Sequence, residues 1–187
     1  LMQKQQNGFH IRLRPVKIAM PINLRQFFPS KTLRNFITMI YPSIDPRLGN
    51  YTFDEIVKHV HHYMHLYIEE KYLMGEMNTN AAAQKHPIAR ISPLFLKDIV
   101  VQDKNSSAGL TNMGVMRLPE DMIPHVERYD IYMGVPYSSR TNCAIISYQN
   151  TLTVNFCSCI VESDVERYFF RKLVEDGIPV TIESNRE

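Results

Sequence analysis

Four histidines fall within seven residues of one predicted helix, and histidine is the commonest protein ligand of transition metals. They are His59, His61, His62 and His65. A helix turns about 100° per residue, so only the i, i+4 pair His61 and His65 is spaced to share one metal ion. His62 and His65 point away from the apolar stripe of the helix, and His59 and His61 flank it on opposite sides. We interpret the cluster as a solvated helix face and expect no metal site.

Two of the three cysteines, Cys157 and Cys159, alternate with Ser158 along a predicted strand. Successive side chains of a strand point to opposite faces, so the two thiols share one face and Ser158 lies on the other. A cysteine nucleophile needs a nearby cation to lower its pKa, and no His or Lys lies close to these thiols in the sequence. We interpret them as buried structural cysteines, outside any disulfide framework, in a reduced compartment.

A hydroxyl, an amide and a glycine follow one another in the run Thr111-Asn112-Met113-Gly114, which by itself is a turn signal. Arg25 follows a predicted strand, with Asn35 ten residues later. The planar guanidinium carries five donors, so we expect Arg25 to have a structural role in binding backbone carbonyls or a carboxylate.

The segment from Leu152 to Leu173 reads as a strand, a tight turn and an amphipathic helix. It resembles the active-site segment of the chloramphenicol acetyltransferase-like superfamily, where the strand ends in HHxxxDG. Cys157 and Ser158 occupy the positions of the two histidines, Glu162 that of the aspartate and Ser163 that of the glycine. In the family the second histidine is the general base, a role that suits a pKa near neutrality. Serine cannot perform it, so the segment resembles the degenerate copy of a tandem-repeat member.

Two further segments strengthen this resemblance. The segments 21–25 and 32–36 are similar to the central part of condensation-type and plant-type acyltransferases, with Arg25 and Asn35 at the matching positions. The run 109–114 resembles the TISNLG stretch of dihydrolipoamide acyltransferases. In that family the hydroxyl residue before the asparagine stabilises the tetrahedral oxyanion, so the resemblance implies this role for Thr111 and loop support for Asn112.

The resemblance, which runs from about Pro15 to the end of the chain, is closest to condensation-like and alcohol acetyltransferase-like proteins. It implies that residues 1–187 form a single domain, the C-terminal subdomain of a longer acyltransferase whose catalytic HHxxxD lies upstream. It further implies acyl-CoA as co-substrate, a small alcohol or amine as acceptor, and no tightly bound cofactor. The alternative is a non-catalytic interaction or regulatory module on the same fold.

The elements that must position these residues follow from hydrophobic periodicity and turn signals. Strands are expected at 15–24, 35–41, 107–112, 128–135, 143–148, 152–159 and 178–182. A capping box at 52–55 opens a helix expected to run to 81–83, a short helix starts at Ser92-Pro93, and a last one runs from Ser163 or Asp164 to Gly177. We expect an α/β two-layer sandwich of the chloramphenicol acetyltransferase-like type, with a mixed, mostly antiparallel sheet and helices on one face.

Composition and charge agree with a globular domain. Hydrophobic residues make up 44% and charged residues 21% of the 187 residues, and the net charge is +2. This balance indicates no nucleic-acid partner, and no apolar run of membrane-spanning length or signal peptide is present. We therefore expect a cytoplasmic protein. The polar start at residues 1–8 favours a piece of a longer protein.

Overall fold

The computed structural model describes residues 14–85, 106–135 and 140–185, which form an α+β fold. Its strands are β1 Val16–Asn23, β2 Ile37–Ile40, β3 Ser43–Ile44, β4 Ala108–Val115, β5 Thr141–Tyr148 and β6 Thr151–Ser158. Its α-helices are α2 Phe53–Tyr67, α3 Glu70–Lys85 and α6 Asp164–Glu175. Short 3-10 turns are η1 Leu24–Gln26, η2 Pro46–Leu48 and η3 Ile123–His125. Within these ranges, no helix is long and apolar enough to cross a membrane.

The strands form one mixed sheet in the order β2-β1-β4-β5-β6, with β3 also paired to β1. Strand β1 is antiparallel to β2 and β3, and β5 is antiparallel to β6. Strand β4 is parallel to both of its neighbours, β1 and β5. The sequence-based expectation of a mixed sheet in an α/β arrangement is therefore confirmed.

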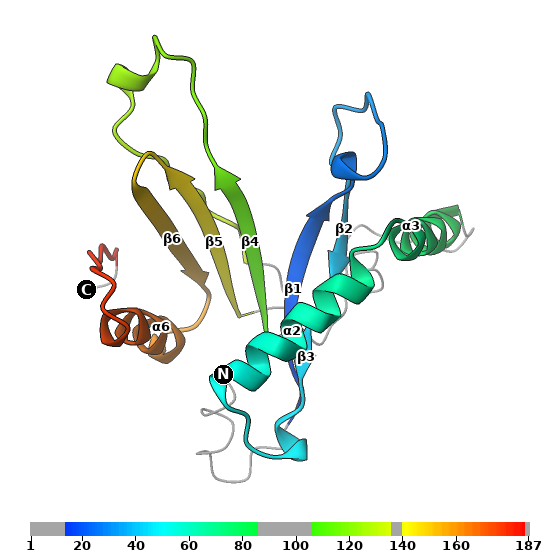
Figure 1. Cartoon of the computed structure of the whole chain (residues 1–187), viewed down its shortest axis with the longest axis horizontal. Helices are drawn as coiled ribbons and strands as arrows, with labels where there is room; N and C mark the ends of the chain where they lie inside the picture. The colour runs from blue at the N-terminus through cyan, green and yellow to red at the C-terminus, as the bar shows by residue number, and fades with distance from the viewer. Residues whose placement is uncertain (1–13, 86–105, 136–139, 186–187) are drawn as a thin grey trace.

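The sheet consists of two limbs, one made of β1, β2 and β3 and the other of β4, β5 and β6. They pair only at Ile18 with Ala108 and at Ala19 with Gly109. Beyond this joint β1 and β4 diverge, as Figure 1 shows. Just before it, the backbone N–H of Ser107 donates to the Lys17 carbonyl at 2.7 Å. The joint is thus short, and each limb packs largely by itself.

Strand β5 is the most buried part of the sheet. Six of its eight residues are buried, because β4 and β6 pair with it on both sides. On β6, the ring of Phe156 contacts the rings of Phe169 and Phe170 of α6, with centroids 5.4 and 5.7 Å apart. Phe156 pairs with Cys143, and paired residues point to the same side of a sheet. We call this side, which carries Cys143 and Phe156, the α6 face.

The other side of the second limb carries Asn142 and Asn155, and we call it the asparagine face. The predicted strand at 128–135 is wrong, because this segment crosses the asparagine face without pairing as a strand. The Nδ2 of Asn142 donates to the Gly134 carbonyl at 2.6 Å, and the Nδ2 of Asn155 donates to the Ile131 carbonyl at 3.1 Å. Side-chain amides thus satisfy carbonyls that a neighbouring strand would otherwise bind.

Helix α2 begins where the sequence predicts but ends earlier. The capping box is complete: the Thr52 hydroxyl accepts from the Glu55 N–H, and the Glu55 carboxylate accepts from the Thr52 N–H. The expected continuation to 81–83 is wrong, because Ile68 leaves the helical conformation with φ −100° and ψ 46°. The new direction lets α3 bury Leu73 completely, with 0% of its surface exposed. The helix expected at Ser92-Pro93 lies outside the described residues.

The last helix, α6, ends at Glu175, two residues before the predicted stop at Gly177, whose φ of +81° favours glycine. Ser163 is its N-cap residue, but the side chain makes no capping hydrogen bond. The strand expected at 178–182 is wrong, because this stretch pairs with no described strand. Glu183 instead forms an ion pair with Arg128, with Oε1 2.8 Å from Nη1. A side-chain pair therefore attaches the C-terminal stretch to the segment that crosses the asparagine face.

Candidate functional site

A buried side-chain amide of β5 binds the backbone of β4 at the first position where the two strands pair. Asn142 is only 3% exposed, and its Oδ1 accepts a hydrogen bond from the Gly109 N–H at 2.9 Å. A Cβ added at Gly109 would lie 2.5 Å from this Oδ1 and 3.0 Å from Cε of Met133. Only glycine therefore fits against the asparagine. Sequence reasoning missed Asn142; the signal was an amide in an otherwise apolar strand, which needs partners when buried.

Thr111, the residue predicted to stabilise an oxyanion, lies two positions after Gly109 on the same face of the sheet. It pairs with Ala144, whose small side chain is only 1% exposed, and is itself half-buried. Gly109 pairs with Asn142, so the register places Thr111 on the asparagine face. The Thr111 hydroxyl thus lies on the side of the sheet opposite α6, at a position where β4 pairs with β5 alone.

A turn follows Thr111 within β4. The Asn112 Oδ1 accepts from the Gly114 N–H at 2.8 Å, and Gly114 has a φ of +71°. The pairing with β5 shifts between Asn112 and Val115, which marks a bulge. The exposed Asn112 side chain therefore shapes the backbone directly after Thr111, where a bulge re-aims the strand.

The segment predicted to match the degenerate HHxxxDG motif lies at the end of β6 and the start of α6, away from Thr111. The Ser158 Oγ is 3.2 Å from the Thr141 Oγ1 and donates to the Arg140 carbonyl at 3.3 Å. Ser158 is two residues after Phe156 and lies on the α6 face, opposite to the face of Thr111. The following Glu162 is exposed, and Ser163 is half-buried at the start of α6. The structure therefore does not bring Thr111 and Ser158 together.

The interpretation of Cys157 and Cys159 as buried residues is wrong, because Cys157 is half-buried and Cys159 is exposed. Cys157 pairs with Asn142 on the asparagine face, and Cys143 lies buried on the α6 face. Burial, and to a lesser extent the nearby Cys157, raises the pKa of Cys143 to about 11, which keeps it protonated at neutral pH. The exposed Cys159 lies beyond the end of β6, with its Sγ 3.5 Å from the Arg140 carbonyl.

The Arg25 side chain forms hydrogen bonds within the connection between β1 and β2. Its Nη2 donates to the carbonyls of Thr32 at 2.9 Å and Arg34 at 2.6 Å, the type of contact expected from its sequence position. Arg25 is nevertheless exposed, as is Asn35. Both belong to the first limb, whereas Thr111 belongs to the second.

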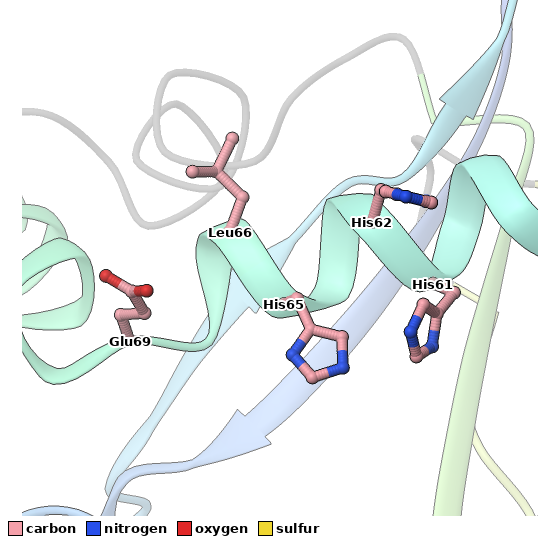
Figure 2. A pocket seen from close by; sticks show the side chains of 5 residues that line it. All are labelled: His61, His62, His65, Leu66 and Glu69. Carbon is pink, nitrogen blue, oxygen red and sulfur yellow. The ribbon is translucent and has the colours of Figure 1, made fainter.

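The histidine cluster lies on the exposed side of α2. His61, His62 and His65 line a shallow hollow with Leu66 and Glu69, which Figure 2 shows in close-up. The rings of His61 and His65 have centroids 4.4 Å apart, and the Nδ1 of His62 is 2.7 Å from the Lys58 carbonyl. No set of three or more metal-binding side chains converges anywhere in residues 14–85, 106–135 and 140–185.

None of the protein-family models, curated proteins or solved structures compared with this chain matches it. The resemblance to the acetyltransferase superfamily therefore remains a prediction from the sequence.

Proposed function

We propose that this chain supplies the oxyanion-binding side of an acyl-transfer site in an acyl-CoA-dependent O- or N-acyltransferase. In this proposal it is the C-terminal half of a chloramphenicol acetyltransferase-like fold. The observation that carries it is the position of Thr111. Its side chain lies half-buried on the asparagine face, directly between the Gly109–Asn142 hydrogen bond and the turn closed by Asn112.

The chemistry requires a donor that is held in place before charge develops. An acceptor hydroxyl or amine attacks the thioester carbonyl, a general base takes its proton, and negative charge grows on the carbonyl oxygen. Collapse of this intermediate breaks the C–S bond and releases the CoA thiol, which receives the proton. A preorganised hydroxyl stabilises the oxyanion without reorganising during the reaction, and in this proposal Thr111 supplies that hydroxyl. The general base would be a histidine upstream of this chain.

The presence of Ser158, where the family carries its general base, indicates that this chain alone is not catalytic, and it leaves a non-catalytic module as the alternative to an enzyme half. The Ser158 hydroxyl is bonded to the Arg140 carbonyl and lies close to that of Thr141, at the position where the family carries its base. The chain by itself should therefore release no CoA from acetyl-CoA in the presence of alcohols or amines. The same assay on the full-length polypeptide encoded by its gene distinguishes an enzyme half from a binding module.

Replacing Thr111 tests the proposal directly. In the full-length polypeptide, Thr111→Ala should lower kcat by about 100- to 1000-fold, the usual loss for one oxyanion donor. Thr111→Ser keeps the hydroxyl and should retain most of the activity. The matched control is Thr153→Ala, because Thr153 is also half-buried and lies on the asparagine face two strands away. Full activity in Thr111→Ala, with CoA release still measurable, would refute the assignment, and loss in both alanine variants would indicate a structural effect.

A further inference from the structure

We propose that His61 and His65 form a two-imidazole binding site for a divalent transition-metal ion on the exposed side of α2. The two residues lie one helical turn apart, and both side chains are exposed. Figure 2 shows both rings on the same side of the helix, with a nitrogen of each turned toward the other ring. This site is separate from Thr111, which lies on β4.

The separation of the rings matches what a shared ion requires. Imidazole nitrogens bind such ions at about 2.0–2.1 Å, which puts two ring centroids about 4.5 Å apart for a right-angled pair and about 5.2 Å apart for a tetrahedral pair. The observed separation of His61 and His65 is 4.4 Å, close to the right-angled value. The rings now meet edge to face at an interplanar angle of 71°, and both side chains are exposed, so each ring is free to rotate and turn a nitrogen toward a common ion.

The neighbouring histidine differs in a way that provides a control. The ring of His62 lies 5.8 Å from that of His61, and its Nδ1 is within hydrogen-bonding distance of the Lys58 carbonyl. In Figure 2 it leaves α2 on another side than His61 and His65. Glu69 is the acidic residue among those that line the hollow, and it lies beyond the end of α2. Water is therefore expected to fill the other coordination positions.

Two ligands on successive turns also link the ion to the helix. The rings come together only when residues 61–65 are helical, so an ion that binds both favours the folded helix over the unfolded chain. Imidazole suits Ni²⁺, Cu²⁺ and Zn²⁺. Ni²⁺ is the best probe here, because Cys159 is exposed and Cu²⁺ oxidises thiols.

The experiment titrates Ni²⁺ into the whole chain by calorimetry and follows the histidine ring signals by NMR. We expect the signals of His61 and His65 to broaden first. His61→Asn or His65→Asn should weaken binding by about 100-fold, since two linked groups bind far more tightly than one. The matched variants His59→Asn and His62→Asn should leave the affinity unchanged, and circular dichroism checks that all variants keep their helices. Equal affinity in the wild type and the His61→Asn/His65→Asn double variant would overturn the proposal.

Discussion

At the scale of single residues, the buried hydrogen bond between Gly109 and Asn142 joins the backbone of β4 to a side chain of β5. The Asn142 amide satisfies the Gly109 N–H and the Gly134 carbonyl in a place that is only 3% exposed. A buried group that loses its partner costs about 1–3 kcal/mol, so Asn142→Ala should lower the free energy of unfolding by about 2–4 kcal/mol. Chemical denaturation measures this directly. An unchanged midpoint would show that water replaces the amide at no cost.

We also expect the effects of substitutions at Gly109 and Asn142 on the free energy of unfolding to be coupled. Gly109→Ala should destabilise the fold by about 1–3 kcal/mol, because the new methyl group meets the Asn142 Oδ1. In the double variant with Asn142→Ala that oxygen is absent, so the total loss should be smaller than the sum of the single losses. Gly75→Ala is the control. A Cβ there meets nothing within 4 Å, and alanine favours the helix.

At the scale of elements, α2 depends on its first turn. Thr52→Ala removes the hydroxyl that accepts from the Glu55 N–H and should lower the free energy of unfolding by about 1 kcal/mol. Thr52→Ser keeps the oxygen and should differ little from the wild type. The hydrogen bonds that Glu55 accepts, first from the Thr52 N–H, lower the pKa of its carboxyl group.

The sign of the pH dependence follows from this shift. A carboxyl group with a lowered pKa in the folded state contributes stability above its unfolded pKa of about 4.5, and the contribution is lost as the pH falls through the folded value. Thr52→Ala keeps the N–H donor but removes the hydroxyl, which also donates to the Glu55 carboxylate at 2.9 Å. The difference between the wild type and Thr52→Ala should therefore be largest near neutral pH and shrink in acid by the part of the pKa shift that the hydroxyl causes. If the difference in the free energy of unfolding stayed constant from pH 7 to pH 3, the contribution of the Thr52 hydroxyl would not depend on the charge of the Glu55 carboxylate.

At the scale of the whole molecule, the two limbs of the sheet should differ in local stability. They pair only at Ile18 with Ala108 and at Ala19 with Gly109, and β5 carries most of the buried strand residues. Regions with more buried contacts open less often. Native-state hydrogen exchange should therefore find the amides of β5 slower than those of β2. Equal protection in both strands would show that the limbs unfold as one cooperative unit.

The sequence by itself determined the elements that depend on local signals. The capping box at Thr52 and the stop at Gly177 lie where turn chemistry places them. Strands β1, β5 and β6 lie within a few residues of the expected ranges, because alternation and β-branched side chains are local properties. The turn after Thr111 is likewise predictable from Asn112 and Gly114.

Only the tertiary structure decided which segments pair and which faces meet. The stretch 128–135 has the composition of a strand, but Asn142 and Asn155 bind its carbonyls in place of a neighbouring strand. Sheet register put Thr111 and Ser158 on opposite faces, although both belong to the predicted site. Side-chain direction in a sheet alternates with every residue, so a face is defined only once strands are paired, and pairing depends on residues far apart in the chain.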